Sequence, residues 1–198
     1  EAVAIFNTVR TLSRSLNQVF FMVKGTVFPE LQFEIGQENW KAAQKVFRVA
    51  LLSVFLMSFL GFIFLAFFGL WFYKIWTNNE LEVPTIMWYI FISGMLFNAI
   101  WWTAEMVFSV VNQPKKMAIY GVVVSLISVG STYVLSKLLG LSGAALGAVS
   151  LDIVLLFMVL PYSCRLMHMS VKELFLHGLG DFKIIYTQLS SKIFKLNS

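Results

Sequence analysis

Two arginines lie near the middle of a segment that is otherwise apolar enough to cross a lipid bilayer. Residues 3–23 contain Arg10 and Arg14, and in a helical projection both lie on one polar stripe, opposite an apolar face. The other members of the stripe are Asn7, Thr11, Asn17 and Gln18. An arginine at mid-bilayer costs roughly 2.5–3.5 kcal/mol on insertion scales, so two on one stripe require partners or water. The sequence therefore predicts a water-filled cavity lined by guanidinium groups.

The chemistry that this stripe favours is the capture of an anion. Guanidinium groups stay charged at physiological pH, and their paired, directional donors match phosphate oxygens. We therefore predict that Arg10 and Arg14 bind an anionic substrate, and that Asn7, Asn17 and Gln18 add hydrogen bonds to hydroxyl groups of that substrate. The alternative is that one or both arginines pair with Glu105 or Asp152 and hold the helices together.

A second polar stripe runs along residues 83–111. It contains Asn98 and Glu105 and is flanked by Trp101 and Trp102. Indole rings offer flat apolar faces on which a ligand can stack, and carboxylates accept hydrogen bonds from hydroxyl groups, so we predict that these four residues contact substrate. Two alternatives stay open for Glu105: a carboxylate that couples transport to H⁺ or Na⁺, and an ion pair with an arginine.

Asp152 is the one charge within residues 143–164. On a helix it faces Ala145, Ala148 and Leu156, which indicates packing. We therefore favour a structural role for Asp152, with ion coupling as the alternative. Apart from a coupling H⁺ or Na⁺, the sequence gives no reason to expect a cofactor.

The composition is that of an all-α integral membrane protein. Hydrophobic residues make up 59% of the 198 residues and charged residues only 13%, whereas soluble domains are about 45–50% apolar. The apolar runs do not alternate with polar residues, which argues against a transmembrane β-barrel. The basic residues flank the apolar runs instead of forming one block, so nucleic acid is not an expected partner.

Neither an enzyme nor a metal site is indicated. The sequence shows no nucleophile beside a base and no glycine-rich phosphate loop after a strand. The single cysteine, Cys164, excludes an internal disulfide. His168 and His177 lie far from any second type of metal ligand, so we predict no metal centre.

About five transmembrane helices are expected. They cover residues 3–23, 49–73, 83–111, 117–136 and 143–164, which form a transmembrane bundle over residues 1–165. Residues 166–198 are expected to form a cytoplasmic amphipathic tail, with helices at 171–176 and 182–194. Most lysines and arginines then lie on one side of the membrane, including Lys183, Lys192 and Lys195 of the tail, and only Lys74 and Lys137 flank the other. The positive-inside rule thus places the C-terminus in the cytoplasm.

Local signals predict where the helices begin and end. Phe28-Pro29-Glu30 is expected to turn the chain at the membrane surface. Asn39 and Ser142 are expected N-caps, the second after a short loop at 137–142. Pro161 is expected to kink or end the fifth span.

The fourth span carries only small polar residues. Gly121, Ser125, Ser128 and Thr132 share one face, which we interpret as a surface for close helix packing.

Several short motifs resemble one family of transporters. They are Ala4-Ile5-Phe6-Asn7-Thr8, Phe28-Pro29-Glu30, Gly36-Gln37-Glu38-Asn39 with Lys41-Ala42, Asn112-Gln113-Pro114, and the glycines and alanines from Gly140 to Ala148. Over residues 1 to 165 the pattern resembles the C-terminal half of polysaccharide exporters, in the superfamily of multidrug-and-toxin extruders and lipid II flippases. The closest likeness is to flippases for O-antigen and related oligosaccharide-lipids.

The resemblance implies two six-helix bundles around a cavity that opens alternately to each side of the bacterial inner membrane. The implied substrate is an oligosaccharide, such as an O-antigen repeat unit, linked through pyrophosphate to undecaprenol. Five helices correspond to part of one bundle, so the implied partner is an N-terminal bundle of the same polypeptide. The chain also begins at Glu1, abruptly at a membrane helix, and we expect it to be a fragment.

Two other functions remain open from the sequence. The first is a cation-coupled multidrug extruder of the same superfamily, which Glu105 and Asp152 would suit better than the arginines. The second is a membrane scaffold that transports nothing. In a scaffold, the polar stripes should be buried against each other with no cavity between them.

Overall fold

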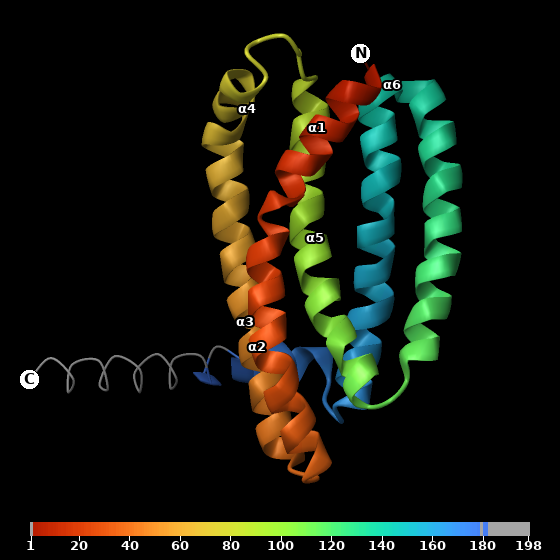
Figure 1. The fold of residues 1–198 in the computed structure, drawn as a ribbon. Coiled ribbons are helices and arrows are strands. Elements are labelled where there is room, and N and C mark those ends of the chain that lie inside the picture. The colour runs from red at the N-terminus through yellow and green to blue at the C-terminus, as the bar shows by residue number, and fades with distance from the viewer. Residues whose placement is uncertain (1, 179, 182–198) are drawn as a thin grey trace, which may run out of the picture.

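The protein is a bundle of long helices. The computed structural model describes residues 2–178 and 180–181, and within them there is no β-strand. The helices are α1 (Ala2–Ser15), α2 (Asn17–Gly36), α3 (Trp40–Phe64), the π-helical turn η1 (Leu65–Gly69), α4 (Leu70–Trp76), α5 (Thr85–Val110) and α6 (Pro114–Leu166) (Figure 1). In the bundle α5 is central, because α1, α2, α3, η1 and α6 all pack against it.

Three helical stretches are long and apolar enough to cross a membrane. They are Trp40–Trp76, Thr85–Val110 and Pro114–Leu166. They fit a multi-pass membrane protein, as the composition predicts. The layout of five spans is matched only in part, because α1 and α2 depart from the expected span at 3–23.

That first span is two helices instead of one. α1 ends at Ser15, and α2 starts at Asn17 after a break at Leu16, where the Val19 amide donates to the Leu16 carbonyl over 3.1 Å. Along this break the chain changes direction, so that α1 leans across the upper bundle (Figure 1).

The turn predicted at Phe28-Pro29-Glu30 is wrong, because α2 runs through Pro29 to Gly36. A proline inside a helix costs about 3 kcal/mol, chiefly through one lost backbone hydrogen bond and a ring clash. Burial compensates here: Leu31 is fully buried, and Val27, Phe28 and Ile35 pack against the same core. The local proline signal is thereby overridden by tertiary packing.

The stretch from α3 to α4 is one apolar rod with a bulge. Asn39 caps its start as predicted, accepting from the Ala42 amide over 3.4 Å. At η1 the helix widens beside Trp88, whose indole donates to the Leu65 carbonyl over 3.3 Å. A side chain at Gly69 would collide with that indole, so a glycine is required there. Large apolar side chains along the rod, from Phe55 to Trp76, are exposed, as expected for a lipid-facing helix.

α6 is a hairpin of two antiparallel arms (Figure 1). The chain reverses at Gly140, whose φ of 60° and ψ of −140° suit glycine alone. The predicted loop at 137–142 therefore shrinks to this one residue. Ser142 lies inside the second arm and does not begin it, which corrects the predicted N-cap. Beyond Pro161 the second arm continues to Leu166, so the proline does not end the helix.

The segment after α6 packs under the bundle. Met167, Met169 and Leu174 are buried in the core that contains Phe47 and Phe108. An ion pair of 2.7 Å joins Arg48 of α3 to Asp181. The predicted helix at 171–176 is present, whereas the one at 182–194 lies outside the described residues, as do Lys183, Lys192 and Lys195.

Candidate functional site

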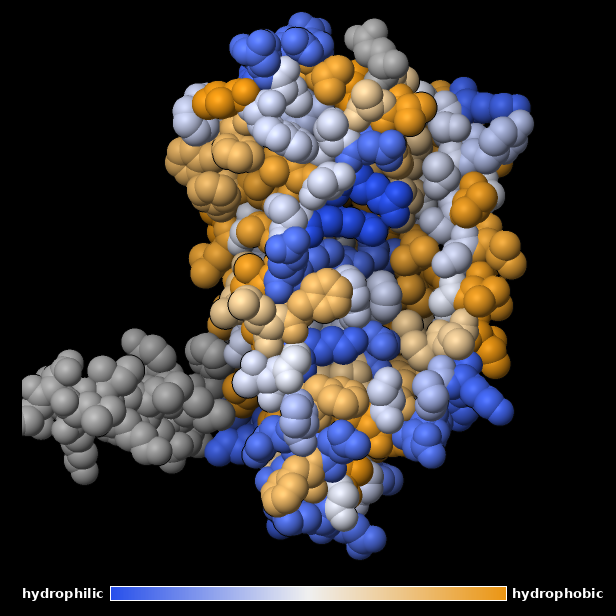
Figure 2. Space-filling model, in the orientation of Figure 1, coloured by the Kyte–Doolittle hydropathy of each residue, from blue (hydrophilic) through white to orange (hydrophobic). Residues whose placement is uncertain are grey.

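A polar cleft lies between α1 and the hairpin of α6, with α5 behind it. Its volume is about 810 Å³, within the range of ligand sites. Figure 2 shows strongly hydrophilic side chains gathered in a hollow of the upper half, with hydrophobic side chains on both flanks. The lining comprises Phe6, Arg10, Arg14, Asn98, Trp101, Trp102, Ser125, Ser128, Val129, Thr132, Tyr133, Ser136, Ala148, Leu151 and Asp152.

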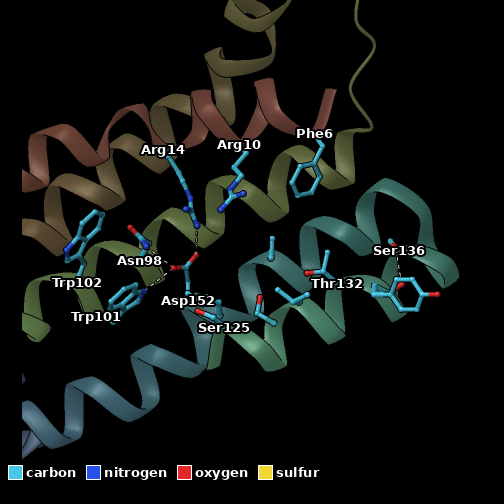
Figure 3. A pocket seen from close by; sticks show the side chains of 15 residues that line it. Phe6, Arg10, Arg14, Asn98, Trp101, Trp102, Ser125, Thr132, Ser136 and Asp152 are labelled. Atoms are coloured by element: carbon cyan, nitrogen blue, oxygen red, sulfur yellow. Dashed lines mark hydrogen bonds and ion pairs between the residues drawn. The ribbon is translucent and has the colours of Figure 1, made fainter. Parts of the chain in front are cut away.

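The two arginines on the α1 wall differ in their surroundings (Figure 3). Nη2 of Arg14 lies 3.3 Å from Oδ2 of Asp152, and the Arg14 side chain is 37% exposed. Arg10, one turn earlier, is exposed and also lines the cleft. No ion pair joins Arg10 to any acid of residues 2–178 or to Asp181. One guanidinium is therefore compensated by an acid, and the other is open to the cleft.

Asp152 lies at the floor of the cleft and is only 2% exposed. Its Oδ1 accepts hydrogen bonds from Nδ2 of Asn98 over 2.7 Å and from Nε1 of Trp101 over 3.0 Å, while Oδ2 faces Arg14. A buried carboxylate needs such donors, because an unpaired charge in a low-dielectric interior is costly. The cluster ties α1, α5 and α6 together. The ion pair between Arg14 and Asp152 is the alternative to substrate binding that the sequence left open, whereas the bonds of Asp152 to Asn98 and Trp101 were not predicted.

A second amide extends the network to α2. Nδ2 of Asn17 donates to Oδ1 of Asn98 over 2.9 Å, and both side chains are buried. Within the described part of the chain, Oδ1 of Asn17 has no hydrogen-bond partner. Asn17 thus supports Asn98 from behind and does not itself line the cleft, where the sequence had predicted it to contact substrate.

Glu105 lies in a different layer, outside the cleft. Its Oε2 is 2.7 Å from Nζ of Lys24 in α2, so its ion pair is with a lysine and not with Arg10 or Arg14. Lys24 also lies 5.8 Å from the ring centre of Trp102, and Phe21 packs edge-on against the same indole at 4.3 Å. Trp102 therefore separates the cleft from the Lys24–Glu105 pair beneath it.

The predicted site residues are thus only partly brought together. Arg10, Arg14, Asn98, Trp101, Trp102 and Asp152 share the cleft. Asn7 and Gln18 are exposed and do not line it. Gln18 misses the cleft because of the break at Leu16: a helix that restarts there no longer continues the polar stripe of α1.

Hydroxyl groups on the first arm of α6 were missed as lining residues. Ser125, Ser128 and Thr132 were predicted to pack closely, and part of that is present: Ser128 donates to the Gly147 carbonyl over 2.9 Å, and Thr132 lies against Gly147. The same face also lines the cleft, continued by Ser136. Spacing of polar residues at i, i+3, i+7 and i+11 was the available signal, since it marks one face of a helix.

No protein-family model, curated protein or solved structure matches this chain. The site must therefore be assigned from its own geometry. Its distinguishing features are a guanidinium that has no acid partner among the described residues, two indoles and a wall of hydroxyls. Among the residues that the structure describes, no group of His, Cys, Asp and Glu is arranged to hold a metal ion.

Proposed function

We propose that this chain is the C-terminal part of a bacterial inner-membrane flippase for lipid-linked oligosaccharide, such as an O-antigen repeat unit on undecaprenyl pyrophosphate. It acts together with a further helical bundle of the same polypeptide, and transport proceeds by alternating access. The observation that carries the proposal is Arg10, which lines a cleft of about 810 Å³ without an acid partner among the described residues.

An uncompensated cation in an apolar bundle favours an anionic ligand. A pyrophosphate linkage supplies oxygens that match the guanidinium fork, and the low dielectric around the cleft strengthens the attraction. Arg14 contributes less, because Asp152 already compensates its charge. The uncharged lining next to Arg10 suits the sugars that follow the pyrophosphate.

The surroundings of the cleft suit a substrate with a lipid tail. The outer faces of α3 and of the first arm of α6 expose large apolar side chains, including Phe59, Leu60, Leu126 and Ile127. In the proposed mechanism, the polyprenyl chain stays in the lipid beside these faces while the head group crosses through the cleft. Rocking of one bundle against the other then opens the cleft to the opposite side.

Neither rival function is favoured by the contacts. A multidrug extruder needs an acid that faces a cationic substrate, whereas Asp152 is bound by Arg14 and Glu105 by Lys24. A scaffold should bury its polar stripes against each other with no cavity between them. Asn17 and Asn98 do meet in this way, but Arg10 and Arg14 of the first stripe line an open cleft instead.

The test is Arg10→Ala in the full-length protein, expressed in cells that depend on it for surface polysaccharide. We expect polysaccharide delivery to be lost while membrane insertion and protein level stay normal. Arg165→Ala is the matched control, since Arg165 is exposed at the end of α6 and does not line the cleft. Normal delivery by Arg10→Ala would refute the proposal.

A further inference from the structure

The wall of the cleft that faces α1 is built from the first arm of α6 (Figure 3). Ser125, Thr132 and Ser136 lie on this wall, seven and four residues apart, so one face of the helix presents them all. From Ser125 to Ser136 the wall extends about 16 Å along the helix axis at 1.5 Å per residue. It carries no charged side chain, in contrast to the α1 wall with its two arginines.

Two of these hydroxyls are free to bind a ligand. A serine or threonine inside a helix commonly bonds back to the carbonyl of the preceding turn. Thr8 and Thr26 do so in this chain, and on the wall Ser136 donates to the Tyr133 carbonyl. For the hydroxyls of Ser125 and Thr132 there is no hydrogen bond to any described residue. Both therefore line the cleft with their donor and acceptor capacity unused.

We propose that this wall is a saccharide subsite, in which Ser125 and Thr132 hydrogen-bond the sugar adjoining the anion held by Arg10. This deepens the proposed function and rests on it. Sugar hydroxyls both donate and accept, which uncharged hydroxyl groups on a protein can match in either direction. A cationic or purely anionic ligand would find no opposite charge on this side.

The aromatic side of the cleft completes the subsite. Trp101 is fixed by its hydrogen bond to Asp152 and lies parallel to Trp102, at 6.2 Å between ring centres. A locked indole gives an apolar face of defined orientation at little entropic cost. The subsite thus orients the substrate, with its anion toward α1 and its sugar between α6 and the indoles.

The experiment compares two probes on the protein in lipid nanodiscs. Farnesyl pyrophosphate carries the anion alone, and the same molecule with an N-acetylglucosamine on its terminal phosphate carries anion and sugar. Titration calorimetry gives a Kd for each. We expect wild type to bind the sugar-bearing probe more tightly. The double variant Ser125→Ala, Thr132→Val should lose about tenfold for that probe only, because two neutral hydrogen bonds are removed.

Two controls separate the outcomes. Ser131→Ala lies on the same arm, but Ser131 does not line the cleft, so its Kd values should equal those of wild type. Farnesyl pyrophosphate, the probe without sugar, tests whether the variant is folded, since a double variant that still binds it retains the anion site. Equal losses for both probes, or no loss for either, would overturn the saccharide subsite while leaving the proposed function intact. Failure of wild type to bind either probe would refute both.

Discussion

The bundle contains two layers with an ion pair each, which differ in their charge balance and in the open space beside them. Each joins a cation of the α1–α2 pair to an acid on another helix: Arg14 to Asp152 in the upper layer, Lys24 to Glu105 in the lower. The lower layer has one cation for one acid, and the space beside it is about 10 Å³, enough for a single water. The upper layer has Arg10 in addition, beside a cleft of about 810 Å³.

The difference favours the upper layer as the proposed ligand site. A balanced pair satisfies itself and holds helices together, as the Lys24–Glu105 pair does between α2 and α5. A layer with one cation in excess, open to a large polar cleft, can lower its energy by taking up an anion. Excess charge together with open volume is therefore a better sign of a site than charge alone.

The largest expected effect comes from removing the acid of the upper layer. Asp152→Ala leaves Asn98 and Trp101 without their acceptor and Arg14 without its counter-charge. We expect a loss of about 3 kcal/mol in the free energy of unfolding, at the lower end for a broken buried pair because Arg14 is partly solvated. Thermal unfolding in detergent measures this loss. Asp152→Asn keeps the shape and should lose less; equal stability of wild type and Asp152→Ala would mean that the network does not hold the helices together.

The next effect separates the two arginines of the upper layer. Arg10→Gln should weaken binding of farnesyl pyrophosphate by about 10–100-fold, the worth of charge-assisted hydrogen bonds, with unchanged stability. Arg14→Gln should instead lower the stability, because it removes the counter-charge of Asp152. It should weaken binding less than Arg10→Gln does, because Asp152 already compensates the charge of Arg14. Calorimetric titration of both variants measures the change in Kd, and thermal unfolding measures the change in stability. Identical behaviour of the two would contradict the distinction between a free and a paired guanidinium.

A smaller effect is expected in the lower layer. Glu105→Gln should cost about 1 kcal/mol of stability, as for a partly exposed pair, and should leave probe binding unchanged. The same two measurements apply. If Glu105→Gln abolished probe binding or polysaccharide delivery, the two layers would not be separable, and a coupling role for this carboxylate would gain support.

The smallest effect concerns an acid outside both layers. The Ser170 amide donates to Glu173 Oε2 over 2.7 Å, and this hydrogen bond to the carboxylate lowers the pKa of Glu173. In return, the Glu173 amide donates to the Ser170 hydroxyl over 3.2 Å. A lowered folded-state pKa contributes stability above the unfolded-state value, and that stability disappears as the pH falls through the folded-state value. The protection factors for hydrogen exchange at residues 171–178, which correct for the pH dependence of intrinsic exchange, should therefore fall at acid pH in wild type. In Glu173→Gln, which cannot ionise, this pH dependence should be absent.

Local structure was predictable where short-range chemistry decides it. Asn39 caps α3 because its side chain reaches an amide three residues on, and the reversal at Gly140 falls within the loop predicted at 137–142. The proline at position 29 was misleading, because the rule for its neighbours ignores Leu31, whose burial keeps α2 intact. The π-helical turn η1 could likewise not be predicted from its own residues, because it forms around Trp88, which belongs to α5.

The sequence by itself determined that this is a helical protein with membrane-spanning character, and that polar stripes run along otherwise apolar helices. Those properties follow from composition and from periodicity along one helix. Only the tertiary structure decided that Asp152 pairs with Arg14, that Glu105 pairs with Lys24 and that Arg10 faces the cleft opposite Ser125 and Thr132. Periodicity determines which residues share one face of a helix. Which other helix packs against that face depends on the break at Leu16 and on the reversal of α6 at Gly140.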